Sequence, residues 1–168
     1  VTAGKATITL PSAFAVEGGS VVSIGGSTAS LNLLGRLDLG VTTSLGAPRL
    51  EVSGAAQFSA QEANLASGAV ASDPLLSFSG DSLATIFSAI RIGSGGISGT
   101  DANLLVRDGA KLGFPGSVLT VGHASSGFGT LIVENGGTFD ATLAPLTLNA
   151  RGTLEVDAAH FKATNIID

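Results

Sequence analysis

The sequence predicts an all-β fold, a right-handed parallel β-helix (β-solenoid) of about six to seven coils, from three observations. A strand motif recurs with a period of about 19–28 residues, the intervals between copies are rich in Gly, Ser and Thr, and no interval resembles a long helix. A roughly constant period with variable insertions is typical of stacked coils, because an insertion at a corner leaves the next coil undisturbed. Parallel crossovers are almost always right-handed, which predicts the hand.

The repeat is clearest in four segments that share the pattern x-x-Leu-x-Val, then a polar or glycine corner, then a second apolar residue. They are PRLEVSGAAQFSA (48–60), ANLLVRDGAKLGF (102–114), GTLIVENGGTFDA (129–141) and GTLEVDAAHFKA (152–163). Looser copies are found at 74–86 and 29–40, and a worn first copy at 5–16. Apolar residues alternate within each copy, which is the period of a strand.

Equivalent inward residues of stacked coils lie above one another, so we expect apolar ladders to form the core. We place Leu10 and Leu33 in the Val column, and Leu39 and Leu83 in the ladder of second apolar residues. Ile92, Val121 and Leu148 indicate another face of the coil. The best-defined ladder residues are Leu50, Val52, Phe58, Leu104, Val106, Leu112, Leu131, Val133, Phe139, Leu154, Val156 and Phe161.

Corner residues form a column of their own, two positions after the Val column. We place Gly35, Gly54, Gly80, Asp108 and Asn135 there. Glycine, asparagine and aspartate are the residues that most readily adopt left-handed backbone angles. The corners are therefore expected to be tight turns.

The segment LTVGHASSGFGTLIVENGGTFDA (119–141), with its x-V-G…G-x-L-x-V-x-x-G-G motif, resembles the repeats of bacterial autotransporter passengers and related secreted adhesins. The resemblance extends over residues 29–163. It implies an extracellular or bacterial cell-surface location, and a structural or adhesive role as a passenger-like stalk.

The amino-acid composition excludes several other classes of protein and of functional site. The 168 residues are 44% apolar and fit a single β-solenoid domain over 1–168. Without Cys there is no disulfide or thiolate zinc site, and without an initiating Met we expect a processed or excised part of a longer secreted chain. The net charge is −5 and the sequence has no run of basic residues, so we do not expect a nucleic-acid partner. No apolar run is long enough to cross a membrane, so we do not expect a membrane span.

Glu134 and Asp157 are the nearest approach to a catalytic pair, because they occupy one column in neighbouring coils. Two adjacent carboxylates can share a proton or bind a cation, yet two solvated surface acids are the simpler interpretation. Arg107 would lie beside Glu134 as an ion pair. We therefore assign no catalytic, cofactor-binding or metal residues, expect no cofactor, and keep Glu134 and Asp157 as a weak candidate pair.

Other motifs are weaker still. His123 precedes Ser125 and Ser126 without an evident acid to orient it, and GSGGISG (93–99) lacks the spacing of a nucleotide-binding loop. Carbohydrate sites commonly use exposed aromatic residues, and the chain has no Tyr or Trp. Phe14, Phe87, Phe114 and Phe128 fall outside the ladders and leave a carbohydrate groove open as an alternative.

Two functions of different class follow. The leading hypothesis is a non-enzymatic extracellular structural or adhesive solenoid, either a stalk or a head-to-tail filament subunit. An open coil end exposes strand edges, so its expected partner is another copy of itself or further coils of the parent chain, alongside a surface or glycan ligand. The alternative, from fold analogy alone, is a β-helix polysaccharide lyase or hydrolase.

Overall fold

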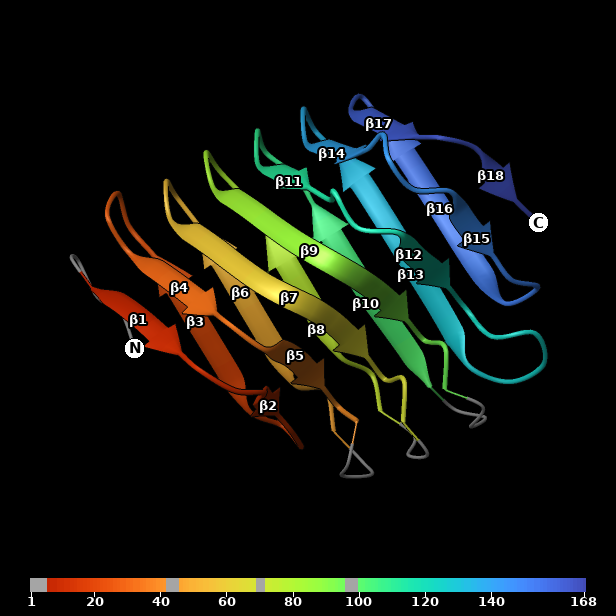
Figure 1. Cartoon of the computed structure of the whole chain (residues 1–168), viewed down its shortest axis with the longest axis horizontal. Coiled ribbons are helices and arrows are strands. Elements are labelled where there is room, and N and C mark those ends of the chain that lie inside the picture. Colours follow the sequence, from red (N-terminus) through yellow and green to blue (C-terminus); the bar gives the residue numbers. More distant parts are fainter. Residues whose placement is uncertain (1–5, 42–45, 69–71, 96–99) are drawn as a thin grey trace.

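The structure is a computed structural model that describes residues 6–41, 46–68, 72–95 and 100–168. These residues form a parallel β-solenoid of about five turns, with 18 strands and no helix (Figure 1). Each full coil contributes one strand to a six-stranded sheet and one long or two short strands to a twelve-stranded sheet. The two sheets form layers that face each other across the core, and the coils follow one another from the N-terminus to the C-terminus.

The six-stranded sheet has the order β16-β13-β10-β8-β6-β3. Its strands are β3 (Val21–Gly25), β6 (Arg49–Ser53), β8 (Leu75–Phe78), β10 (Asp101–Val106), β13 (Phe128–Glu134) and β16 (Gly152–Asp157). All neighbours are parallel, and alternate residues point into the core. Two inward ladders result, Val22-Leu50-Leu76-Leu104-Leu131-Leu154 and Ile24-Val52-Phe78-Val106-Val133-Val156.

The twelve-stranded sheet has two halves. The first runs β1-β4-β7-β9-β11-β14-β17, with β1 (Thr7–Leu10), β4 (Ser30–Leu33), β7 (Gln57–Leu65), β9 (Leu83–Ile92), β11 (Lys111–Gly113), β14 (Thr138–Ala141) and β17 (His160–Ala163). The second half continues from the long strands β7 and β9 and adds β2 (Phe14–Val16), β5 (Arg36–Leu39), β12 (Val118–Val121), β15 (Leu146–Leu148) and β18 (Ile166–Ile167). Partner residues are 20 positions apart at Leu146 and Ile166 and 29 apart at Ile90 and Leu119.

Inward ladders of the twelve-stranded sheet complete the core. The first half stacks Ile8-Leu31-Phe58-Ala84-Leu112-Phe139-Phe161. The second half stacks Leu39 with Leu65, Ile92, Val121 and Leu148. Rings join the two sheets, because Phe58 and Phe78 have centroids 5.5 Å apart. The core is therefore continuous from coil to coil.

Four ladder assignments were wrong, three at the N-terminal end and one at a corner. Leu10 and Leu33 lie in the twelve-stranded sheet, and Ile24 takes the place in the Val column that we gave to Leu33. The two N-terminal copies were therefore out of register, and the predicted count of six to seven coils was too high. Leu39 belongs to the ladder of Ile92. Leu83 points outward and is 48% exposed, because Ala84 pairs with Phe58 in its place.

Tight corners follow the Val column, as their composition indicates. Gly54, Gly80, Asp108 and Asn135 all have positive φ, between 49° and 66°. The N-terminal member of this column is Gly26, with φ of 109°, and not Gly35, which follows from the corrected register. In the last coil the position is held by an alanine, Ala158, with φ of 49°.

A second column of left-handed residues follows the second half of the twelve-stranded sheet, at Gly40, Ala66, Gly93 and Gly122. Gly122 has a φ of 75°, and a methyl group on it would collide with the backbone of Arg151 and Gly152 in the next coil. Glycine is required there for both its backbone angle and its small volume. At Gly136 the φ is 79°, but the nearest atom to an added methyl group is 3.9 Å away.

Both terminal coils leave apolar residues uncovered. Val156 stands above Val133 in the same ladder, yet Val133 is fully buried and Val156 is 47% exposed. Ile166 and Ile167 of β18 are 54% and 48% exposed. At the opposite end Ile8 and Val22 are only partly buried. The ladders therefore reach both end surfaces of the described structure.

Replacing Gly122 with Ala should lower the free energy of unfolding by about 3 kcal/mol, because left-handed strain adds to a backbone collision. Gly136→Ala is the matched control and should cost about 1 kcal/mol, since its methyl group meets open space. Guanidinium titration followed by circular dichroism measures both. Equal losses in the two variants would contradict the close approach of coils at Gly122.

Candidate functional site

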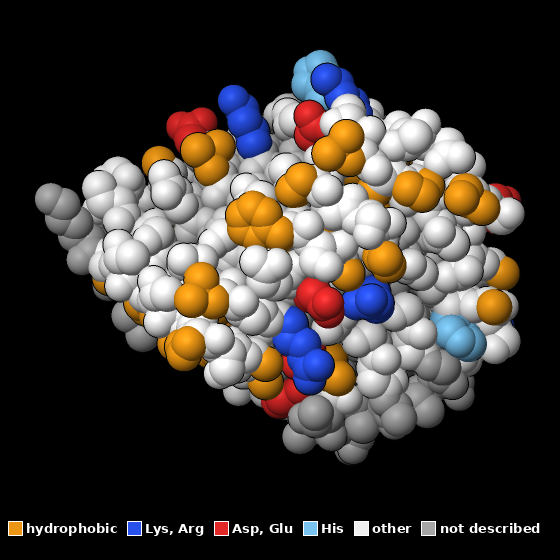
Figure 2. Space-filling view, viewed as in Figure 1, with side chains coloured by type: hydrophobic (Ala, Val, Ile, Leu, Met, Phe, Trp, Pro, Cys, Tyr) orange, Lys and Arg blue, Asp and Glu red, His pale blue; other side chains and the backbone are white. Residues whose placement is uncertain are grey.

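Outward side chains of the twelve-stranded sheet carry two features that the core does not explain. The first, which we call the polar ladder, consists of Arg36, Asp38, Glu62, Asn64 and Arg91 on β5, β7 and β9. The second is a groove on the other half of the same sheet. Figure 2 views this face and shows acidic and basic side chains side by side near its middle.

The polar ladder is a chain of contacts across three coils. Arg36 Nε donates to Asp38 Oδ2 at 2.7 Å, and Asn64 Nδ2 donates to Asp38 Oδ1 at 3.1 Å. Arg91 Nη1 donates to Asn64 Oδ1 at 3.2 Å and lies 3.4 Å from Glu62 Oε2. The central amide thus links an acid in one coil to a base two coils away.

Burial makes these contacts necessary. Asp38 is 6% exposed and Asn64 is 7% exposed, although both belong to an outward column. A buried carboxylate or amide is costly without partners, and a charge-assisted bond is the strongest available. The hydrogen bond and charge of Asp38 raise the pKa of the Arg36 guanidinium above its usual value. Two acids and two bases balance, so the polar ladder is a neutral, internally bonded network.

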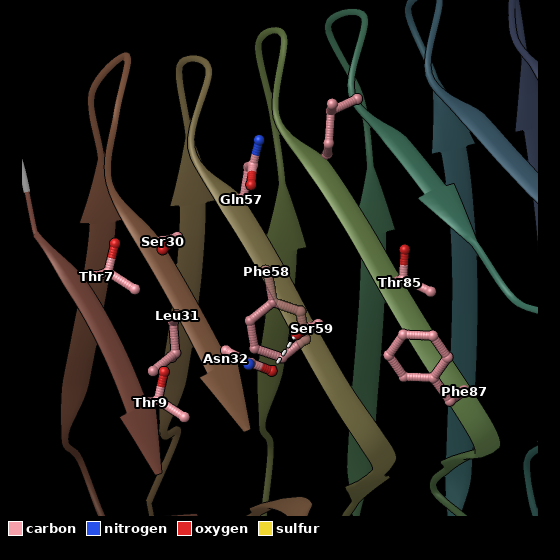
Figure 3. Close-up of a pocket in the computed structure, with 11 residues that line it drawn as sticks. Thr7, Thr9, Ser30, Leu31, Asn32, Gln57, Phe58, Ser59, Thr85 and Phe87 are labelled. Carbon is pink, nitrogen blue, oxygen red and sulfur yellow. Dashed lines mark hydrogen bonds between the residues drawn. The ribbon is translucent and has the colours of Figure 1, made fainter. Parts of the chain in front are cut away.

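The groove lies on the first half of the sheet and has a volume of about 460 Å³ (Figure 3). We call it the uncharged groove, because none of its described lining residues is charged. The residues come from β1, β4, β7 and β9, and eight of them form two outward columns. These are Thr7-Ser30-Gln57-Leu83 and Thr9-Asn32-Ser59-Thr85.

Two large apolar side chains rise beside these small polar ones. Leu83 and Phe87, both on β9, are 48% and 47% exposed. In Figure 3 the Phe87 ring lies next to Thr85 on the outer face of its strand. Phe87 sits where the pairing of β7 with β9 shifts register, between Ala60 and Glu62 of β7. Such bulges redirect outward side chains, and here the irregularity marks one end of the uncharged groove.

Glu134 and Asp157, the acidic pair suggested by the sequence, are directly opposite each other across β13 and β16. Asp157 is exposed and Glu134 is half-buried. Arg107 contacts Asp108 at 3.4 Å, so its nearest described ion-pair partner lies in its own corner. Within the described ranges, no group of three or more His, Asp or Glu residues gathers as a metal site.

His123 lies in a turn after β12 that its own backbone closes by donating to the Gly127 carbonyl at 2.9 Å. Ser126 Oγ is 3.1 Å from His123 Nδ1, and the Ser125 backbone N–H donates to the same nitrogen at 3.3 Å. These bonds stabilise the turn. Of the GSGGISG segment, residues 96–99 lie outside the described residues.

Comparison with protein-family models, with curated proteins and with solved structures found no match. The resemblance to autotransporter passengers therefore stays a prediction. In the part of the chain that the structure describes, no helix has the length and apolarity needed to cross a membrane.

Sequence reasoning missed the polar ladder, although a signal for it exists. Each of its three central residues is flanked by two apolar ones, in LDL (37–39), ANL (63–65) and IRI (90–92). We aligned Ile92 with the correct face, but Leu39 was assigned to another ladder. With Leu39, Leu65 and Ile92 in register, the preceding residues Asp38 and Arg91 fall into one column.

Asn64→Ala should lower the free energy of unfolding by about 2 kcal/mol, because the buried Asp38 Oδ1 and the Arg91 guanidinium each lose a partner. Asn103→Ala is the control, since the Asn103 side chain lies on an outward position of β10 and its amide donates to the nearby Asp101 carbonyl in a solvent-exposed bond. That change should stay within about 0.5 kcal/mol. Denaturant titration of both variants provides the comparison, and an unchanged Asn64→Ala midpoint would show that the polar ladder adds no stability.

Proposed function

We propose that this chain is a non-enzymatic extracellular structural and adhesive element, a rigid β-solenoid that serves in a stalk or in a head-to-tail filament. The observation that carries the proposal is the unbroken stacking of inward ladders from the first coil to the last. Each internal strand is hydrogen-bonded to parallel neighbours on both sides. Such a rod holds its outer surface at fixed spacing over its length.

The end coils support the partner part of the proposal. Their uncovered residues, such as Val156 and Ile8, continue the ladders that pack between coils in the interior. The surface that matches them is another coil of the same kind, supplied by further chain or by a second copy. The sequence motif at 119–141 supports an extracellular or bacterial cell-surface location through its resemblance to secreted passengers.

The polar ladder supports a structural role for the middle of the rod. Its ionised groups bond to one another: Arg91 pairs with Glu62 on the neighbouring coil, while Arg36 pairs with Asp38 within β5. Asp38 is joined to the next coil through Asn64, so the network as a whole links the coils. Groups that act as general acids or bases instead need a free face toward a substrate. A polysaccharide lyase or hydrolase is the alternative proposal, favoured by the side-by-side placement of Glu134 and Asp157.

Incubation with a panel of acidic polysaccharides, with and without calcium, should release no soluble product. The reason is that the proposed role needs no bond cleavage. Reducing-end and unsaturated-product assays provide the measurement, and a Glu134→Ala/Asp157→Ala variant is the control. Product formation that disappears in this variant while its circular dichroism spectrum is retained would overturn the structural proposal in favour of the enzyme.

Electron microscopy over a concentration series should show rods that join end to end as concentration rises, because apolar coil ends gain burial on stacking. Val156→Lys should shift this association to higher concentration, since it places a charge on the end surface. Leu143→Lys is the control, because Leu143 is 72% exposed and lies outside the end ladders. Irregular aggregates in place of rods would contradict the proposal.

A further inference from the structure

The uncharged groove offers hydrogen bonds without charge. Its polar lining consists of hydroxyl and amide side chains, among them Thr7, Thr9, Gln57 and Thr85. Hydroxyl and amide groups can each donate and accept, as sugar hydroxyls also do. An anionic ligand would find no counter-charge among the described lining residues, and a cation would find no carboxylate there. The chemistry of the lining therefore favours a neutral, hydroxyl-rich ligand.

One polar pair in the uncharged groove is already oriented. Ser59 Oγ donates to Asn32 Oδ1 at 2.6 Å, across β4 and β7. With its oxygen engaged, the Asn32 amide is held in one orientation and its Nδ2 hydrogens remain as donors at the groove. Figure 3 shows this bond at the floor of the groove, between the ends of the two side chains. A donor fixed in advance costs less to order when a ligand binds.

The exposed ring of Phe87 supplies the apolar part of the site. Phe87 and Leu83 both stand on β9, at one end of the polar columns, and each is about half exposed. Sugar rings carry hydroxyls at their edges and C–H groups on their faces, so they pack on an aromatic ring while bonding to polar neighbours. Binding sites for small ligands combine apolar walls with a few placed polar groups in this way.

The direction of the groove indicates an extended ligand. Its two columns run along the rod axis across four strands, from Thr7 to Leu83 and from Thr9 to Thr85. Neighbouring strands are about 4.8 Å apart, so similar groups recur at each coil. A chain of repeated units lying along the rod meets one coil after another. The column that contains Leu83 continues on β11 with Lys111, which pairs with Leu83, so the uncharged stretch ends there.

We propose that the uncharged groove binds a neutral glycan chain that lies along the rod axis, with a sugar ring on Phe87 and hydroxyls bonded to the amides of Asn32 and Gln57. The proposal deepens the adhesive part of the proposed function and rests on it. It names the ligand class, neutral polysaccharide, and the coils that hold it.

Nuclear magnetic resonance on isotopically labelled protein tests this site directly. Soluble neutral oligosaccharides, namely β-glucan, xylan and mannan fragments, are titrated beside acidic pectate and alginate fragments. At least one neutral series should shift the side-chain amides of Asn32 and Gln57 and the ring of Phe87, with saturation. Failure of every neutral fragment to shift these signals would overturn the proposal, and so would a response to the acidic fragments alone.

Variants separate a specific site from general surface effects. Phe87→Ala should weaken binding about tenfold through loss of the ring contact. Phe128→Ala is the matched control, because Phe128 is also 47% exposed but lies on β13 and packs against Arg151. Gln57→Ala should weaken binding about fivefold through loss of a hydrogen bond. Its matched control is Gln61→Ala, because Gln61 lies outside the groove. Equal effects in the members of either pair would contradict the site.

Three further outcomes separate this inference from other occupants of the groove and from the proposed function. If the ring signal of Phe87, which lies on β9 and away from the end strand β1, shifts with protein concentration in the absence of sugar, a second copy of the chain occupies the groove and the glycan proposal fails. Absence of binding while rods form and no polysaccharide is cleaved would leave the structural function standing and overturn the glycan site alone. Cleavage of a bound fragment would overturn the non-enzymatic function, while shifts at Asn32 and Gln57 would still support the site.

Discussion

Parallel, in-register stacking of one coil on the next is the constraint on which the rest of this structure depends. Backbone groups bond along the rod, so each inward side chain meets its equivalent one coil away. A slip of one residue would turn every core residue outward. Ladders nevertheless tolerate different sizes, as Ala84 between Phe58 and Leu112 shows. The large ring of Phe78 on the facing sheet contacts Phe58 across the core.

The same stacking accounts for the polar ladder. Asp38, Asn64 and Arg91 lie in one column, so a hydrogen bond between equivalent positions joins side chains 26 and 27 residues apart. An acid, an amide and a base in that order satisfy one another without like charges in contact. In the interior the stacked groups are apolar and gain from burial. On this face they are polar, and their mutual bonds compensate for the loss of water.

Much of the fold was predictable because the pattern x-x-Leu-x-Val recurs in the later coils with a six-residue step to the next ladder. Val106 to Leu112 and Val133 to Phe139 follow this step, and it also places Ala84 six residues after Phe78. We expected Leu83 there, one residue earlier. The N-terminal coil was misaligned because VVSIGG (21–26) carries Val and Ile where later coils carry Leu and Val. The polar ladder and the uncharged groove depend on register across coils, which residue type alone does not determine.

Residues of the inward columns must be apolar because they pack in the core, whereas the residue types of the outward columns can vary. The surface of a solenoid therefore takes its shape from its outward side chains. The groove forms where small residues such as Ser30 and Ser59 lie beside the larger Phe87 and Leu83, next to the register shift between β7 and β9. One substitution on an outward column can therefore create or fill a binding surface without disturbing the core. This separation allows a rigid rod to carry recognition on one stretch of its face, while the polar ladder on the adjoining half of the sheet reinforces the coils beneath.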